Sequence, residues 1–341
     1  MRIDNKTKKI LNDERLLGNR ERWFARMQGI YGGRNCPPTA VMGILGTAED
    51  PGLIYENPEL WVTCAMEDLA ARAEAAVSEK YFVPLCIESA LYGVHFIDKI
   101  LGAKVFFQDG QWYNHYMEHE VGRLEEPDLE SNEVWILAKR VAKAFVEQGV
   151  TVPLFGLPTI ASALNISVNL YGEEMLVALI TDPEGARHDL EIINEVLVKI
   201  HRWYRSHIPE SQLQPVISWE RTQPPGYGQI CGCTTQLISP ELYREFIMKL
   251  DEAVLGVYPR GGMIHLCGRH RQMIPLFAQM ENLKSVQLND RAAEDLEYYV
   301  RGLKGDQIIY LNPCPGMTIE RGLEITGGRR LILAAPYEGG D

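Results

Sequence analysis

A histidine and a cysteine with metal-ligand spacing end one apolar segment of this sequence. His265 and Cys267 are separated by one residue, in a run (263–267) that is typical of a β-strand. Side chains alternate along a strand, so both should point to the same side, and Gly268 then lets the chain turn away. An imidazole and a thiolate are ligands for a soft divalent ion such as zinc. The alternative is a hydrogen-bonded histidine beside a buried structural cysteine.

Two further predicted strand ends could add ligands to His265 and Cys267. Cys314 follows the second apolar run after that of His265, and Asp290 ends the run between them. We therefore predict a zinc site made by His265, Cys267 and Cys314. Asp290, a solvent molecule or a substrate atom would complete the tetrahedron, as in catalytic zinc sites that keep one open position.

Other polar residues are candidates by position. Cys231 and Cys233 form a Cys-Gly-Cys sequence in a glycine-rich segment, which could supply metal ligands or a redox pair, although loop packing is the interpretation we favour. Glu220 ends the fourth apolar run, where it would be a base or an orienting acceptor, or the ion-pair partner of Arg221. His270 could orient a substrate, although a solvated position at a helix start is what its context favours.

Asn312 and two carboxylates complete the predicted site. We expect Asp290 and Glu220 to act in catalysis, and Asn312 and His270 to contact a cofactor or substrate. Glu88, at the end of the second apolar run, is a candidate on position alone.

The elements that position these residues alternate regularly. Eight short apolar runs lie at 38–44, 81–87, 151–157, 213–220, 263–267, 285–290, 308–313 and 330–336. Helical patterns fill the gaps, at 58–79, 130–148, 183–205, 239–254, 270–281, 291–303 and 317–326. This alternation predicts an α/β fold, a single (β/α)8 barrel whose chemistry lies at the carboxyl ends of the strands. A doubly wound open sheet is the rival, but no glycine-rich phosphate loop follows the first run.

We expect an N-terminal helical extension over residues 1–30 and the barrel over 31–341. Insertions are expected at about 101–120 and 158–182, the first a hairpin turning at Asp109-Gly110.

Composition and charge exclude several classes of protein. The 341 residues are 46% hydrophobic and 23% charged, as in globular domains, and the net charge of −12 argues against nucleic acid or an anionic membrane as partner. No apolar run approaches the roughly 18 residues of a membrane span. The charged N-terminus is unlike a secretory signal, and the seven cysteines, an odd number, are expected to be reduced. These features predict a cytoplasmic protein.

Several segments resemble the uroporphyrinogen decarboxylase superfamily. They are Asn19-Arg20-Glu21-Arg22-Trp23, LGAKV (101–105), the run 234–254 and GGMIHLCG (261–268), within a similarity that extends over roughly 19–336. The resemblance implies a (β/α)8 barrel. It argues against porphyrinogen decarboxylation, because GILGTAEDPG (43–52) lacks the arginine pair of the decarboxylases and the last apolar run ends without their histidine.

The zinc-dependent corrinoid methyltransferase branch has a His-x-Cys motif plus a distant cysteine, and His265-Leu266-Cys267 matches its first part. The usual distant cysteine would fall near Pro336-Tyr337 and is absent, so Cys314 would have to replace it. The resemblance implies methyl transfer between a corrinoid, as methyl-cobalamin or on a corrinoid protein, and a thiol or tetrahydrofolate.

Two other functions stay open. A metal-free barrel could bind folate, with Asp290, Glu220 and Asn312 contacting the pterin, or a barrel without zinc could act as a decarboxylase. A non-catalytic barrel could instead carry a corrinoid or tetrapyrrole.

Overall fold

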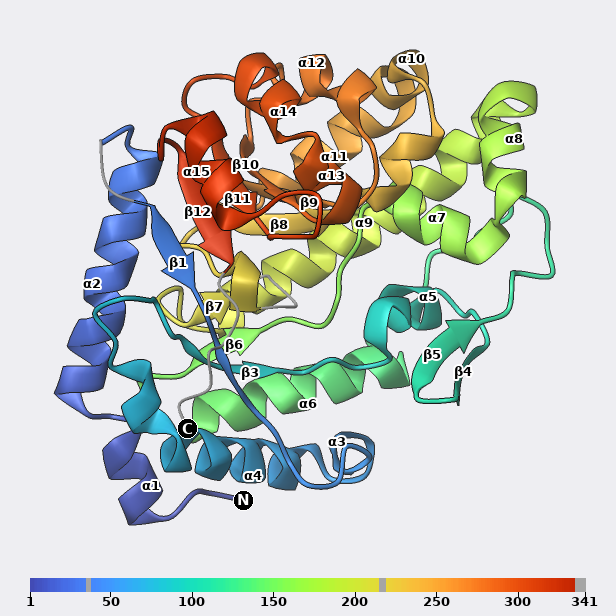
Figure 1. Cartoon of the computed structure of the whole chain (residues 1–341). Helices are drawn as coiled ribbons and strands as arrows, with labels where there is room; N and C mark the ends of the chain where they lie inside the picture. The colour runs from blue at the N-terminus through green and yellow to red at the C-terminus, as the bar shows by residue number, and fades with distance from the viewer. Residues whose placement is uncertain (35–37, 215–218, 335–341) are drawn as a thin grey trace.

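Two sheets of parallel strands lie at the centre of the folded molecule (Figure 1). The computed structural model describes residues 1–34, 38–214 and 219–334. One sheet has the order β1-β12-β11-β10-β9-β8 and the other β2-β3-β6-β7. Their strands are β1 (Thr39–Val41), β2 (Ile44–Gly46), β3 (Leu85–Glu88), β6 (Leu154–Gly156), β7 (Leu213–Gln214), β8 (Gly228–Cys231), β9 (Gly262–Leu266), β10 (Leu283–Leu288), β11 (Ile308–Leu311) and β12 (Leu331–Ala334).

The two sheets are joined on one side by the chain itself. Only two residues separate β1 from β2, and Val41 makes an isolated parallel bridge with Phe82. On the other side a single bridge joins Ala161 to Cys231, and β7 and β8 are not paired within the described residues. The fold is therefore mixed α/β with parallel sheets, as the sequence predicts, without a continuous strand ladder around its interior in the described part of the chain.

Strands of both sheets nevertheless contribute to one buried cluster. It contains side chains from β1, β3, β6, β9, β11 and β12, namely Val41, Cys86, Leu154, Met263, Ile308, Tyr310 and Ile332. Helix α2 (Glu14–Tyr31) adds Trp23, Phe24 and Met27, so it covers one end of this shared interior. The expected N-terminal helix thus has a structural role, which is to close the end opposite to the carboxyl ends of the strands.

Helices surround the sheets. Besides α2 they are α1 (Asn5–Ile10), α3 (Leu53–Glu56), α4 (Pro58–Ala71), α5 (Phe96–Ile100), α6 (Glu133–Glu147), α7 (Ala163–Tyr171), α8 (Glu173–Thr181), α9 (Pro183–His207), α10 (Pro240–Leu242), α11 (Met248–Leu255), α12 (Ile274–Phe277), α13 (Asp290–Glu294), α14 (Leu296–Gly302) and α15 (Ile319–Thr326). Single turns of other helix types are η1 (Ala73–Ala76), η2 (Gly93–His95), η3 (Trp219–Arg221), η4 (Cys233–Leu237), η5 (Tyr243–Ile247) and η6 (Arg271–Met273).

Local sequence signals explain many of these boundaries. The Asn57 side chain accepts from the N–H of Leu60 and caps α4, with Pro58 at its first position. Ser239 caps α10 in the same way, as its Ser-Pro sequence predicts. The predicted hairpin is confirmed as β4 (Val105–Gln108) and β5 (Gln111–Asn114), whose turn has positive φ at both central residues.

One strand was missed and another is shorter than predicted. The segment Gly228–Cys231, which the sequence places in a loop, is a fully buried strand of the six-stranded sheet. Of the run 213–220, only Leu213–Gln214 is a strand, 219–221 is a single helical turn, and 215–218 lie outside the described residues. The end of the run 330–336 also lies outside them.

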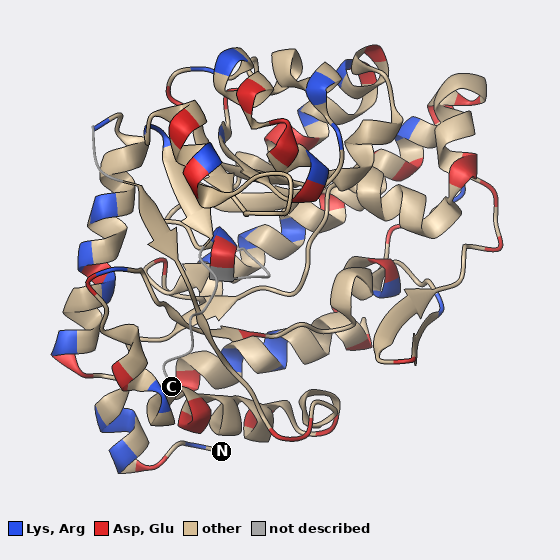
Figure 2. Ribbon diagram, in the orientation of Figure 1, with Lys and Arg blue, Asp and Glu red and all other residues tan. Residues whose placement is uncertain are grey.

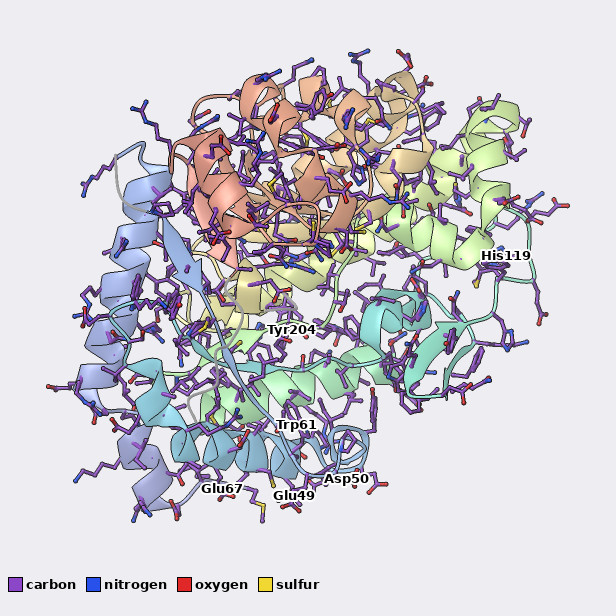
Figure 3. All side chains as sticks on the ribbon, viewed as in Figure 1. Glu49, Asp50, Trp61, Glu67, His119 and Tyr204 are labelled. Carbon is purple, nitrogen blue, oxygen red and sulfur yellow. The ribbon has the colours of Figure 1, made fainter. Side chains whose placement is uncertain are left out.

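Charged residues of both signs are scattered over the helices (Figure 2). Glu49, Asp50 and Glu67 lie at the edge of the molecule, whereas Tyr204 lies in its interior (Figure 3). Within the described ranges no single helix is long and apolar enough to cross a membrane, although the bent pair α7 and α8 meets that test on length and composition.

Candidate metal centre

Two adjacent strands carry the cysteines and the histidine of the candidate metal centre. Strands β8 and β9 are parallel, with Cys231 opposite His265 in the register. Cys233 begins the turn η4 just beyond β8, and Cys267 follows β9 directly. The carboxyl ends of neighbouring parallel strands meet at one edge of the sheet, which is where these side chains converge.

Cys233, His265 and Cys267 each offer a ligand atom, and these atoms all lie within 4.8 Å of one another. Atoms bound to one zinc ion at about 2.0–2.3 Å cannot be more than about 4.6 Å apart. Small side-chain adjustments therefore suffice to place all three on one ion. His265 is buried, while the two cysteines are half-buried, so a ligand can reach the group from solvent.

A glutamine fixes the imidazole of His265. Gln287 is opposite His265 in the register of β10 and β9, and its Oε1 is hydrogen-bonded to Nδ1 of the ring. A carboxamide oxygen only accepts, so Nδ1 carries a proton, and Nε2 is the ring nitrogen left to interact with Cys267 or to bind a metal. Gln287 thus acts as the orienting partner that metal-bound histidines normally have.

The side chains of Cys233 and Cys267 are hydrogen-bonded to each other. A hydrogen bond from Cys233, followed by one from His265, lowers the pKa of Cys267 below its ordinary value. The same hydrogen bond, followed by burial, raises the pKa of Cys233. Cys267 is therefore the thiolate of the pair, and a bound cation would take the place of the hydrogen between the two sulfurs.

A buried histidine holds the two cysteine loops together. His270 Nδ1 is hydrogen-bonded to Thr235 Oγ1 at 2.9 Å, and Nε2 lies 3.3 Å from the N–H of Gly268. Thr235 also donates to the carbonyl of Gly232 at 2.8 Å. Burial, ahead of the charge of His265, lowers the pKa of His270 to about 4, so the ring is neutral. The expectation of a solvated ring is wrong, and both ring nitrogens have partners within the chain.

The predicted carboxylates and Asn312 lie near the same edge. Asn312 Nδ2 donates to Glu220 Oε1 at 3.5 Å, and burial, followed by the charge of Glu220, raises the pKa of Glu88. Asp290 is close enough to Cys267 for its charge to oppose ionisation of that thiol. Asp290 also has a positive φ of 45°, a strained conformation that side chains at functional sites often adopt.

Cys314 and Cys231 have other partners. The half-buried Cys314 thiol donates to the carbonyl of Asp290 at 3.6 Å, and Cys314 is not part of the three-residue group. Cys231 is buried, and its sulfur accepts a hydrogen bond from the Arg221 guanidinium at 3.8 Å. The structure therefore joins His265 and Cys267 to Cys233, and that Cys314 is a ligand stays a prediction.

Sequence reasoning gave no ligand role to Gln287 and little weight to Cys233. The signal for Cys233 was the Cys-Gly-Cys sequence, which indicates a metal ligand only if the segment that ends at Cys231 is a strand. No local signal marks Gln287, because its role depends on the register with β9.

No family model matches the sequence, and no curated protein matches it. Among solved structures, a methyltransferase from Methanosarcina mazei superimposes with a TM-score of 0.60 at 12% identity, over 91% of each chain. A B12-independent methionine synthase from Shewanella sp. W3-18-1, solved with selenomethionine, gives a TM-score of 0.48 at 10% identity, over 87% of this chain and 89% of that one. At such identity the first likeness shows a shared fold.

Proposed function

We propose that this chain is a methyltransferase with a zinc ion held by Cys233, His265 and Cys267. The observation that carries the proposal is the convergence of these three ligand atoms at the ends of two adjacent parallel strands. The structural likeness to a methyltransferase supports it, as does the sequence resemblance to zinc-dependent corrinoid methyltransferases. We also propose that the two sheets belong to one (β/α)8 barrel, since both line one buried cluster.

The donor set fits zinc. Two sulfurs and one imidazole nitrogen are soft and borderline ligands, and three protein ligands leave one position for substrate, as in catalytic zinc sites. Zinc, when bound, would supply Lewis acidity that keeps a thiol substrate deprotonated near neutral pH.

The surrounding residues would orient the reactants. Gln287 holds the imidazole in one tautomer, and His270 holds the loops of the two cysteines at a fixed separation. Asp290, next to Cys267, is the candidate base for the proton of the methyl acceptor. Glu220 and Asn312, hydrogen-bonded to each other, are candidates for binding polar groups of the acceptor.

The methyl donor we propose is a corrinoid, as methyl-cobalamin or on a partner corrinoid protein, and the acceptor is a thiol or tetrahydrofolate. The choice of a corrinoid rests on the sequence resemblance alone.

The metal content of single cysteine variants tests the ligand set. Wild type should hold about one zinc per chain, and Cys233→Ala and Cys267→Ala should lose most of it. Cys314→Ala is the matched control, because it removes a half-buried thiol outside the group, and it should keep its zinc. Loss in Cys314→Ala with retention in Cys233→Ala would instead support the ligand set expected from sequence. Equal zinc content in all four proteins would refute the site.

The reaction is tested separately by following the absorbance of methyl-cobalamin. We expect the zinc-loaded protein to consume it with either a thiol or tetrahydrofolate, and Cys267→Ala to be inactive. A zinc-free wild-type protein that binds tetrahydrofolate without consuming methyl-cobalamin would favour the folate-binding alternative.

A further inference from the structure

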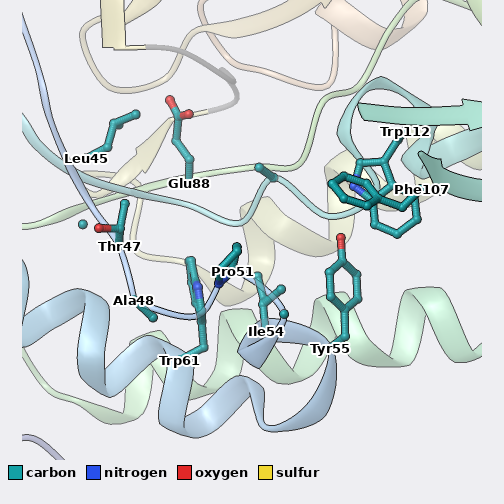
Figure 4. A pocket seen from close by; sticks show the side chains of 13 residues that line it. Leu45, Thr47, Ala48, Pro51, Ile54, Tyr55, Trp61, Glu88, Phe107 and Trp112 are labelled. Atoms are coloured by element: carbon teal, nitrogen blue, oxygen red, sulfur yellow. The ribbon is translucent and has the colours of Figure 1, made fainter. Parts of the chain in front are cut away.

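A cavity lies apart from Cys233, His265 and Cys267, the three metal-binding candidates. It has a volume of about 530 Å³, within the range of small-molecule sites. Its walls come from the ends of β2 and β3, from α3 and α4, and from the hairpin β4–β5 (Figure 4). No residue of the metal-binding group lines it.

Aromatic side chains supply much of its wall. Trp112 of the hairpin contacts Phe107 at 5.1 Å and Tyr55 at 5.7 Å between ring centroids, so these rings form one cluster. Trp61 of α4 stands on the other side of Pro51 from this cluster (Figure 4). Phe107 is 59% exposed, which places the hairpin at the mouth of the cavity. Indole and phenyl surfaces on both sides favour a ligand with a flat ring, which gains offset or edge contacts beyond simple burial.

Among the described residues that line the cavity, only Glu88 has a carboxyl group. It projects from the end of β3, and its Oε1 is buried without a hydrogen-bond partner in the described part of the chain. Leaving a buried polar atom unpaired is unfavourable, and a ligand with a complementary group would recover that loss. Burial, followed by the charge of Glu220, raises the pKa of Glu88 to about 8, so near neutral pH this carboxyl can donate a hydrogen bond.

The charge of the lining residues disfavours an anionic ligand. Within the described chain no Lys, Arg or His lines the cavity, so an anion buried there would have no cationic lining side chain to pair with; Arg221, whose charge acts on Glu88, is not among the lining residues. A quaternary ammonium ligand would need several ring faces around one point. Three of the four rings instead pack against one another, with interplanar angles of 57–58° at Trp112.

We propose that this cavity binds an uncharged, flat aromatic molecule whose hydroxyl group pairs with the Glu88 carboxyl. The site is separate from the proposed zinc site, and binding requires neither metal nor methyl transfer. It is therefore tested independently of the proposed function.

Calorimetric titration of the full chain, with no metal added, tests the proposal with three probes. They are 2-naphthol, which is flat and uncharged, 2-naphthoate, which is its anionic counterpart, and benzyltrimethylammonium, a cation. We expect 2-naphthol to bind with a Kd below about 1 mM, which is about −4 kcal/mol, and the other two to show no binding at the same concentrations.

Two variants locate the binding. Ala90→Phe adds a ring at an exposed lining position and removes nothing, and it should weaken 2-naphthol binding about tenfold or more. Val177→Phe, on α8 and 56% exposed, adds a ring outside the cavity and should leave the Kd within about twofold. Glu88→Ala should weaken binding about fivefold to tenfold, because the ligand hydroxyl loses its partner.

Failure of 2-naphthol to bind would overturn the proposal. So would unchanged binding in both Ala90→Phe and Glu88→Ala, or equal binding of either charged probe.

Discussion

Glu88 gives the sharpest test of the electrostatics at the strand ends. Its pKa is about 8 in the folded chain, against 4.5 for an ordinary glutamate. Between these values the folded state binds more protons than the unfolded state, so the free energy of unfolding should fall as pH rises from about 4.5 to 8. At 1.36 kcal/mol per pKa unit, the difference corresponds to at most about 5 kcal/mol. Water entering the open cavity will reduce this, so we expect about 2–4 kcal/mol.

The perturbation is Glu88→Gln, which keeps the shape of the side chain and cannot ionise. Urea unfolding of both proteins at pH 5, 7 and 9 gives the difference in their free energies of unfolding. The variant should gain about 2–4 kcal/mol relative to wild type between pH 5 and pH 9. Glu49→Gln removes the same charge from the exposed edge of the molecule (Figure 3) and is the matched control, with an expected change below about 0.5 kcal/mol.

Parallel curves for wild type and Glu88→Gln over this pH range would refute the reasoning, because they would mean that Glu88 is already ionised at pH 5 in the folded chain.

Three other predictions concern the metal centre and the strands that build it. In metal-free protein, iodoacetamide should modify Cys267 readily at pH 6, and Cys233→Ala should slow this several-fold by removing the hydrogen bond that stabilises the thiolate, as peptide mass spectrometry would show. Thr235→Val removes the partner of His270 and should weaken zinc binding about tenfold in a chelator competition, while unchanged affinity would mean that the loops are fixed by other contacts. Gly262→Ala would place a Cβ 2.3 Å from a backbone oxygen of β8, and chemical denaturation should show a loss of about 3 kcal/mol or more.

Local signals in the sequence were sufficient for much of the fold. The hairpin was predictable because Asp109-Gly110 is a turn sequence that accepts positive φ at both positions. The start of α10 was predictable because Ser239 and the following proline are a capping pair. These features depend on residues close together in the chain, so no knowledge of the tertiary structure was needed.

Strand β8 was not predictable in the same way. The segment Gly228–Cys231 is four residues long, starts with glycine and is followed by another, a pattern more typical of a loop. It is a strand because it pairs with β9. Gly262 of β9 lies so close to the backbone of Gly228 that no side chain would fit at position 262. This tertiary pairing overrides local preference, and it also moves Cys233 from a loop to a strand end.

The spacing of strands explains why the structure joins Cys233, and not Cys314, to the predicted His-x-Cys pair. Neighbouring strands lie about 4.8 Å apart, a distance that ligands of one zinc ion span easily. Strand β8 is the direct neighbour of β9, whereas β11, which precedes Cys314, is separated from β9 by β10. Two strand spacings are about 10 Å, so Cys314 could share an ion only if its loop folded back over β10. In a parallel sheet, ligands of one metal ion should therefore be sought first on strands that are adjacent in the sheet.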